Sequence, residues 1–212
     1  MNYFISAIGT DSGKTLISAI VTEALQADYW KPMQSGLTPR DAETVESLLT
    51  NDHTFIHPEQ FLFNTPVSPH VAAKIDGIEV NINELEFPYT ENNVVIEGAG
   101  GLLVPINYKG DFIADLIPYF NAEIILVSNN YLGSINHTLL TINEIKRRNL
   151  KVKGIIFNGP SNEETENYIL NYSQFRCLLK VKQHDKITQE IVKKYAIELM
   201  GNWRSQEEWD AL

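Results

Sequence analysis

The tripeptide Gly13-Lys14-Thr15 limits the possible folds of this chain more than any other segment. It stands between an apolar run at residues 3–8 and a helix-like stretch at residues 16–27. A strand that leads through a loop of small residues into a helix is a common arrangement for holding phosphate, because backbone N–H groups and the helix dipole converge there. The strict pattern Gly-x4-Gly-Lys-(Ser/Thr) fails, since Ile8 occupies the position of its first glycine. The sequence therefore predicts a variant phosphate loop.

Short β-rich runs alternate with helical periodicity along the rest of the chain. The runs Val94–Ile96 and Ile124–Val127 are continuously apolar, as expected for strands covered on both faces. This alternation predicts an α/β fold of the P-loop NTPase-like kind, with a doubly wound, mainly parallel sheet flanked by helices. No repeat, low-complexity tract or linker interrupts it, so we expect a single domain over residues 1–212.

The expected strands are Tyr3–Ala7, Tyr29–Met33, Val94–Glu97, Glu123–Ser128, Val152–Asn158 and Cys177–Val181. The expected helices are Lys14–Ala27, Asp41–Leu49, Phe112–Phe120, Ser134–Arg148, Glu163–Tyr172 and Ile187–Leu199. Residues 51–92 are the least regular stretch, and we expect mostly loop and short helix there.

Composition excludes several classes of protein. The net charge of −10 argues against binding to nucleic acid or to an anionic membrane, because phosphate neutralisation needs clustered Lys and Arg. There is no apolar run of about 18 residues and no leader pattern, so neither membrane spanning nor export is indicated. The single cysteine, Cys177, excludes an internal disulfide, and we expect it to be buried and inert. We expect a cytoplasmic protein.

Chemically rich segments follow three of the expected strands. In a doubly wound sheet, ligands bind beyond the carboxyl ends of the strands. There the chain has the phosphate loop, the segment Lys31–Gly36 and the segment Glu97–Gly101. A carboxylate at the end of a buried strand, followed by small residues, suits a magnesium ion near phosphates.

Other interpretations of these residues stay open at the level of the sequence. Asp41 could be only the first-turn acid of its helix, and Lys31 could be a surface lysine with an apolar stem. Beside a phosphate site, Lys31 would instead stabilise the charge that develops during transfer. His53, His57 and His184 lack a partner at metal-ligand spacing, so we expect loop or surface positions for them.

Taken together, the segments resemble dethiobiotin synthetases. The resemblance rests on motifs that occur in the order of that family and span residues 5 to about 160: Gly9–Thr15, Lys31–Gly36, Asp41, Ser68-Pro69-His70, Glu97–Gly101, Gly133–Thr141 and Asn158. Family loops carry a glycine where this chain has Ala7, a small substitute that keeps the loop length.

The resemblance implies a reaction and a set of site residues. The family joins 7,8-diaminononanoate, CO2 and ATP into a cyclic urea, with Mg2+ as the cofactor. The resemblance implies catalytic contacts by Lys14 and Lys31 and a substrate contact by Ser35. It implies magnesium ligation by Thr15, Asp41 and Glu97. The implied nucleotide contacts are Asp11, Ser12, Gly13, Lys14, Thr15, Leu16, Asp41, Glu97, Gly98, Ala99, Gly100 and Asn158.

The resemblance also implies a homodimer with sites shared between subunits. In the family, the turn Gly133, Ser134, Ile135 and Asn136 contacts the distal carboxylate of the substrate in the other subunit's site. A helix that begins at a Gly-Ser pair presents free N–H groups, which suits a carboxylate. A simple N-cap by Ser134 is the alternative.

The resemblance weakens toward the C-terminus. Family members carry a Pro-rich adenine-binding segment after the sixth strand, and residues 178–183 do not contain it. This difference predicts weaker discrimination of ATP from other nucleoside triphosphates. His70 and His137 lie inside matching segments, and we expect them to support the loop and the helix rather than to transfer protons.

Three rival functions account for less of the sequence. A partitioning ATPase would carry an extra lysine early in the phosphate loop, and no lysine precedes Lys14. An amidotransferase-linked synthetase would share the phosphate loop and the carboxylates, but it would not explain Lys31–Gly36 together with Gly133–Thr141. A non-catalytic nucleotide-binding module would bind ATP without releasing phosphate in response to the diamine.

Overall fold

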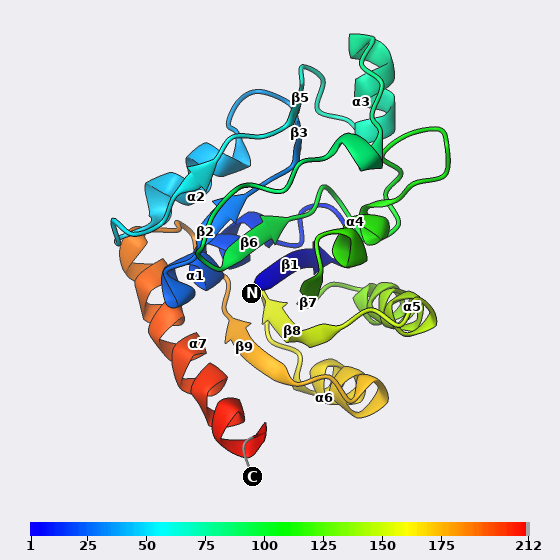
Figure 1. The fold of residues 1–212 in the computed structure, drawn as a ribbon. Helices are drawn as coiled ribbons and strands as arrows, with labels where there is room; N and C mark the ends of the chain where they lie inside the picture. Colours follow the sequence, from blue (N-terminus) through cyan, green and yellow to red (C-terminus); the bar gives the residue numbers. More distant parts are fainter. Residues whose placement is uncertain (211–212) are drawn as a thin grey trace.

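A parallel sheet forms the centre of the molecule. The computed structural model describes the backbone of residues 1–210 and the side chains of residues 1–203. Within that range, seven strands lie in the order β4-β2-β6-β1-β7-β8-β9, and every neighbouring pair is parallel (Figure 1). A second, two-stranded parallel sheet pairs β3 with β5. The predicted fold class is confirmed.

The elements have the following bounds. The strands are β1 Asn2–Ala7, β2 Asp28–Trp30, β3 Met33–Ser35, β4 Ile56–His57, β5 Phe61–Phe63, β6 Val94–Glu97, β7 Ala122–Asn129, β8 Val152–Asn158 and β9 Cys177–Val181. The helices are α1 Lys14–Leu25, α2 Asp41–Leu48, α3 Pro69–Asp76, α4 Ile113–Tyr119, α5 Ser134–Arg147, α6 Glu163–Ser173 and α7 Gln189–Asp210, with a 3-10 turn at Ile82–Glu84.

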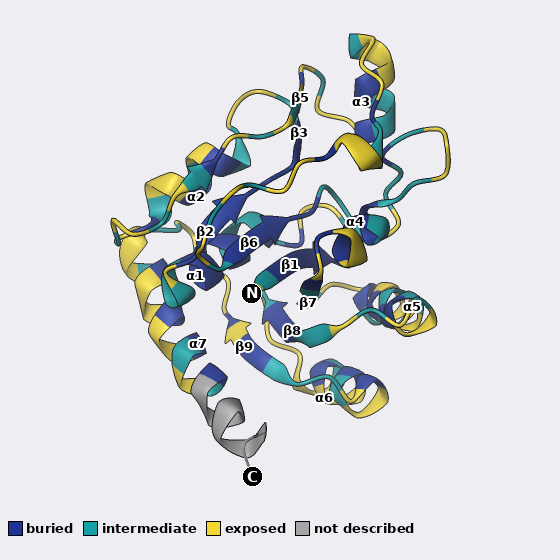
Figure 2. Cartoon of the chain, viewed as in Figure 1, coloured by how far each residue is buried: buried dark blue, intermediate teal, exposed yellow. Residues whose placement is uncertain are grey.

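Helices cover both faces of the sheet because alternate strand residues point to opposite sides. Phe4 of β1 faces a core that includes apolar residues of α3, α4, α5 and α6. Its neighbour Ile5 faces a second core formed with α1, α2 and α7. The strands are accordingly buried, while the outer sides of the helices are exposed (Figure 2). The N-terminus, which begins β1, lies between the two helical layers in Figure 1.

The expected strand Tyr29–Met33 is divided in two. β2 ends at Trp30, and β3 begins at Met33 in the small sheet. Pro32 has no N–H to donate to a ladder, so the strand cannot continue through it. The break leaves Lys31 at the carboxyl end of β2.

Residues 51–92 contain more structure than expected. The helix α3 fits the expectation, but β4 and β5 do not, and β4 forms an edge of the main sheet. These strands have only two and three residues, which is too short for an alternating pattern to show. The expected end of the last helix at Leu199 is also wrong, because α7 continues to Asp210 and buries Trp203 against Tyr3, with ring centroids 5.1 Å apart.

Two side chains lie in environments that the sequence did not indicate. His57 is buried in β4, where its Nε2 lies 3.1 Å from Asp28 Oδ2, so its expected surface position is wrong. Cys177 is half-buried rather than buried. Partial burial still raises the pKa of its thiol, which keeps the group in its less reactive protonated form.

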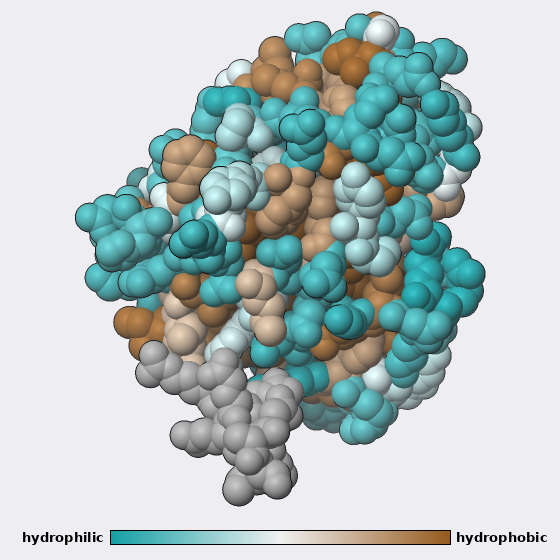
Figure 3. Space-filling view, in the orientation of Figure 1, coloured by the Kyte–Doolittle hydropathy of each residue, from teal (hydrophilic) through white to brown (hydrophobic). Residues whose placement is uncertain are grey.

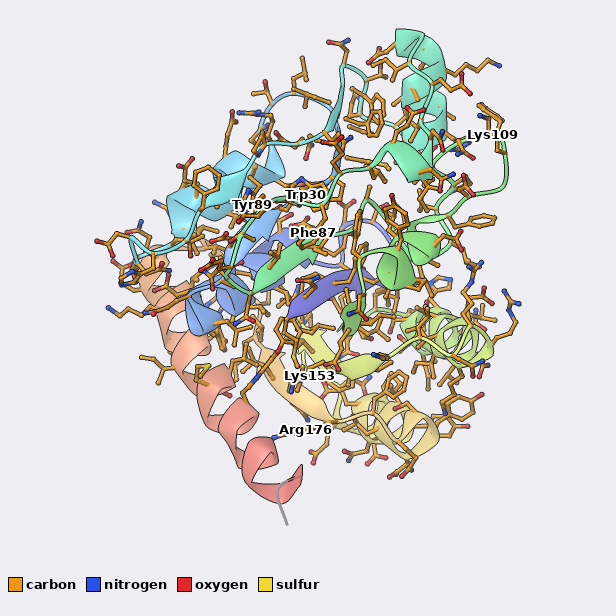
Figure 4. All side chains as sticks on the ribbon, in the orientation of Figure 1. Trp30, Phe87, Tyr89, Lys109, Lys153 and Arg176 are labelled. Atoms are coloured by element: carbon orange, nitrogen blue, oxygen red, sulfur yellow. The ribbon has the colours of Figure 1, made fainter. Side chains whose placement is uncertain are left out.

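The face of the molecule seen in Figure 3 is mainly hydrophilic, with apolar residues in scattered patches. Three aromatic side chains pack together. Trp30 and Phe87, which lie close together in Figure 4, meet edge to face with ring centroids 5.8 Å apart, and Phe120 packs on both. Lys153, also labelled there, lies 4.5 Å from the ring centroid of Trp203. No helix in the described part of the chain is both long and apolar enough to cross a membrane.

Candidate active site

A cleft of about 600 Å³ lies where the carboxyl ends of β1, β2 and β6 meet the starts of α1 and α2. Its lining combines the phosphate loop with the segments that follow β2 and β6. The lining residues are Thr10, Asp11, Gly13, Lys14, Thr15, Lys31, Gln34, Ser35, Asp41, Pro66, Val67, Ser68, Pro69, Glu97, Ala99, Gly100 and Val104. The three segments therefore meet at one edge of the sheet, as predicted from the sequence.

The phosphate loop closes tightly onto β8. Gly13 has φ of 90°, a conformation that favours glycine, and a Cβ at this position would lie 2.1 Å from Asn158 Nδ2. Asn158 donates from Nδ2 to the Ser12 carbonyl oxygen at 3.0 Å. Asn158 thus contacts the loop directly from the end of β8, which lies two strands from β1 in the sheet.

Lys14 is held inside the loop that it follows. Its side chain is buried, and Nζ donates to the Gly9 carbonyl oxygen at 3.3 Å. Burial lowers the pKa of Lys14, and the Lys31 ammonium lowers it further, while the carboxylates of Glu97 and Asp41 oppose this shift. Binding of an anion in the cleft would favour the charged form of Lys14.

Three oxygens meet at the start of α1. Thr15 Oγ1 lies 3.0 Å from Asp41 Oδ1 and 3.0 Å from Glu97 Oε1. These groups come from three elements, α1, α2 and β6, which only the folded sheet brings together. Among the described residues no cluster of three or more His, Cys, Asp and Glu side chains is placed to hold a metal. A cation here would have two carboxylates and a hydroxyl as protein ligands, a set that suits Mg2+ with its remaining positions left to water or phosphate.

Lys31 lies between the same two carboxylates. Its Nζ forms ion pairs with Asp41 Oδ2 and with Glu97 Oε1, the latter at 3.2 Å. Burial acts to lower the pKa of Lys31, but Glu97 and Asp41 outweigh it, so the pKa is raised and the ammonium stays charged. The surface position considered for Lys31 from the sequence is wrong, because the residue is only 5% exposed.

Ser35 and Gln34 form the wall that follows Lys31. Ser35 Oγ is buried and has no hydrogen-bond partner among the described residues, so a ligand in the cleft could supply one. Gln34 donates from Nε2 to the Ser35 and Gly36 carbonyl oxygens at 3.2 and 3.1 Å, and its Oε1 accepts from Asp41 N at 3.4 Å. Gln34 therefore links the Ser35 segment to the start of α2.

Tyr29 was not among the predicted site residues, yet it is fully buried and donates from its hydroxyl to Glu97 Oε2 at 2.9 Å. Burial, together with the Glu97 and Asp41 carboxylates, raises the pKa of Tyr29 well above its ordinary value, so the phenol stays protonated. The alternation of side chains could have indicated it, because Tyr29 stands two residues before Lys31 in an extended segment. Thr10, Gln34 and Val104 were also missed.

Some of the expected contact residues do not line the cleft. Ser12 is buried, with Oγ donating to the Gly9 carbonyl oxygen at 3.2 Å. Leu16 packs against the core beneath α1. Gly98 serves close packing, since a Cβ there would lie 2.8 Å from the Phe4 ring. These three residues support the segments that line the cleft without lining it themselves.

The turn Gly133–Asn136 also lies outside the lining of this cleft. Gly133 and Asn136 are exposed, and Gly133 is the N-cap residue of α5, with φ of 97°. Ser134 accepts a hydrogen bond from Tyr131 N at 3.2 Å and does not cap the helix, so the simple N-cap by Ser134 is not what the structure has.

Known proteins match most of the chain. A family model described as an AAA domain matches residues 1–191. Among solved structures, the MinD cell division ATPase of Pyrococcus furiosus covers 97% of this chain and 100% of its own, with a TM-score of 0.59 and 13% identity. A putative plasmid partition protein of Borrelia burgdorferi covers 97% of this chain and 98% of its own, with a TM-score of 0.56 and 12% identity. At such low identity these two structures support the fold alone.

Curated relatives are much more similar in sequence. The ATP-dependent dethiobiotin synthetase BioD of Cytophaga hutchinsonii is 56% identical over 95% of this chain and 98% of its own length. The protein of the same name from Christiangramia forsetii is 46% identical over 92% of this chain and 94% of its own. The chain belongs to the family of ATP-dependent dethiobiotin synthetases.

Proposed function

We propose that this chain, as a single catalytic domain, uses Mg2+ and ATP to carboxylate 7,8-diaminononanoate and close the ring to dethiobiotin. The observation that carries the proposal is the position of Lys31, a buried ammonium between Asp41 and Glu97 at the mouth of a phosphate loop. A plain nucleotide-binding module has no need of a second buried lysine there. The family relationship points to the same reaction.

The reaction divides into three steps that this cleft would hold in one place. An amine of the substrate attacks CO2 and loses a proton, which gives a carbamate. A carbamate oxygen then attacks the γ-phosphorus of ATP, and the bond to ADP breaks. The second amine attacks the activated carbonyl carbon, loses a proton and expels phosphate. Positioning and charge neutralisation supply the catalysis, as in other phosphoryl transfers.

The residues have separate tasks in this scheme. Lys14 and Lys31 would hold the γ-phosphate and carbamate oxygens, and Ser35 Oγ would donate a hydrogen bond to the reacting end of the substrate. Thr15, Asp41 and Glu97 would hold Mg2+, which neutralises charge on the phosphate oxygens when bound. Asn158 would contact the base beside the loop.

The remaining parts of the proposal concern assembly and location. The turn Gly133–Asn136, in which Gly133 and Asn136 are exposed, would bind the distal carboxylate of a substrate held mainly by the partner subunit. Two such subunits would form a homodimer with two shared sites. We place the enzyme in the cytoplasm, where ATP and CO2 are both supplied.

Phosphate release from Mg-ATP tests the proposal, measured with and without 7,8-diaminononanoate and bicarbonate, with mass spectrometry of the product. We expect release that depends on the diamine, and dethiobiotin as the product. Lys31→Met should lower kcat by at least about 100-fold, as expected for removal of a preorganised charge. Lys109→Met, which removes an exposed lysine paired with Glu79, is the matched control and should leave kcat unchanged.

Other outcomes separate the alternatives. Binding of ATP without diamine-dependent release would favour a nucleotide-binding module, and hydrolysis that ignores the diamine would leave the substrate to be found. The same assay with GTP and CTP tests the weaker base discrimination expected from the loop after β9, which lacks the Pro-rich segment.

A further inference from the structure

Glu97 presents its two carboxylate oxygens to different partners. It is the last residue of β6 and is only 1% exposed. Oε1 faces the cleft, where it lies 3.0 Å from Thr15 Oγ1 and 3.2 Å from Lys31 Nζ. Oε2 points away from those groups and accepts from the Tyr29 hydroxyl at 2.9 Å. Both oxygens of the Glu97 carboxylate are thus held by hydrogen bonds.

Tyr29 reaches this position from the neighbouring strand. In the parallel register of β2 and β6 it pairs with Val95, two residues before Glu97. Two residues of strand rise about 6.6 Å, which a tyrosine side chain spans. The ring packs in the core beneath α1 and α2, with Ala42 and Val45. That packing leaves the phenol little freedom to point elsewhere.

We propose that Tyr29 is a positioning residue that holds the Glu97 carboxylate so that one oxygen, Oε1, faces the cation site. The inference rests on the proposed magnesium ligation by Glu97. The terminal torsion of a glutamate is broad, so an unrestrained carboxylate could turn both oxygens toward the Lys31 ammonium. The hydrogen bond from Tyr29 prevents that rotation and prepares Oε1 for the cation.

Such outer partners commonly tune metal sites. Hydrogen-bond donors behind a metal-binding carboxylate orient it, and their loss typically weakens metal affinity or activity by about 10- to 100-fold. A purely structural tyrosine would satisfy its own buried hydroxyl and would affect stability alone. The two roles therefore differ in one measurable quantity, the gain in nucleotide affinity that the metal provides.

Calorimetric titration with a non-hydrolysable ATP analogue measures that gain, taken as the ratio of the dissociation constants in EDTA and in Mg2+. We expect Tyr29→Phe, which keeps the ring, to lower the ratio about tenfold and to leave the affinity in EDTA unchanged. Tyr119→Phe is the control, because it removes a hydroxyl of α4 that donates to the Leu85 carbonyl oxygen, and neither residue lines the cleft. It should keep the wild-type ratio.

Glu97→Gln and the double variant complete the experiment. Glu97→Gln should lower the ratio, and adding Tyr29→Phe to it should lower the ratio no further, because Tyr29 acts through the Glu97 carboxylate. Tyr29→Met, which also lacks the donor, should reproduce the effect of Tyr29→Phe and guards against a specific packing defect in one variant.

Each contrary outcome has one meaning. An unchanged ratio in Tyr29→Phe, with a lowered ratio in Glu97→Gln, would overturn the role of Tyr29 and leave the magnesium site intact. An unchanged ratio in Glu97→Gln would overturn the magnesium assignment, and the inference with it. Equal losses in Tyr29→Phe and Tyr119→Phe would show a general effect of hydroxyl removal and would also overturn the inference.

Discussion

Single residues determine whether the phosphate loop keeps its shape. Gly13 is the clearest example, because its backbone conformation and its neighbour both exclude a side chain. A left-handed conformation costs about 1–2 kcal/mol for a residue that carries a Cβ. The contact with Asn158 adds to that cost, so strain at Gly13 also disturbs the residue that we expect to contact the base.

We expect Gly13→Ala to weaken binding of a non-hydrolysable ATP analogue by at least about tenfold, the factor that corresponds to 1.4 kcal/mol. Calorimetry measures the affinity, and thermal unfolding shows whether the variant is folded. Gly9→Ala is a matched control in the same loop, since an added Cβ meets no atom within 4 Å and Gly9 does not line the cleft. Equal losses in both variants would contradict the steric argument.

At the scale of elements, α5 is fixed at its C-terminal end by a cluster of charges. Glu144 accepts hydrogen bonds from Arg147 and Arg148, and Arg148 also pairs with Asp115 near the start of α4. The two arginines lower the pKa of Glu144 from its ordinary value of 4.5 to about 2. The position of α5 matters because the turn Gly133–Asn136 is at its other end.

Because the pKa of Glu144 is lowered, the contribution of this cluster to stability depends on pH. Its contribution to stability is fully present above the ordinary pKa of 4.5 and is lost as the pH falls toward 2. Glu144→Gln should destabilise the protein by about 0.5–1 kcal/mol at pH 7, as for other solvent-accessible ion pairs, and by less at pH 3. Urea unfolding at both pH values measures this, with the exposed Glu198→Gln on α7 as control. A difference that stays constant with pH would rule out the arginine cluster as its cause.

At the scale of the whole molecule, the cleft holds every proposed catalytic side chain but not the proposed carboxylate-binding turn. Gly133 and Asn136 of this turn are exposed at the start of α5, so the proposed second subunit could reach them. A site shared between subunits therefore predicts how much activity a mixture of two variants should regain.

Two impaired variants, assayed at a diamine concentration well below the raised KM, should restore activity when mixed. Lys31→Ala removes the lysine of the cleft, and Asn136→Asp places a repelling charge in the turn, which should raise the KM for the diamine. In an equal mixture half of the dimers are hybrids, and one of the two sites in each hybrid is intact. Turnover should recover to roughly a quarter of the wild-type value after unfolding and reassembly. No recovery, with hybrids detected by native mass spectrometry, would mean that each site lies within one subunit.

Much of the fold and the cleft was predictable because the decisive signals are local. Val94–Ile96 and Ile124–Val127 are apolar enough to identify central strands without any partner. Gly13, Lys14 and Thr15 form one contiguous loop, and the rule that ligands bind beyond the carboxyl ends of parallel strands places Lys31 and Glu97 beside it. β4 and β5 were not predictable, because strands of two and three residues carry no period.

The sequence by itself determined the class of fold, the phosphate loop and the family resemblance, since these depend on contiguous residues and their order. Only the tertiary structure decided that Lys31 lies between Asp41 and Glu97, that Tyr29 holds the far oxygen of Glu97, and that His57 is buried beside Asp28. These contacts join residues from 10 to 68 positions apart. Side chains so distant in the chain meet only when the register of neighbouring strands and the packing of helices bring them together.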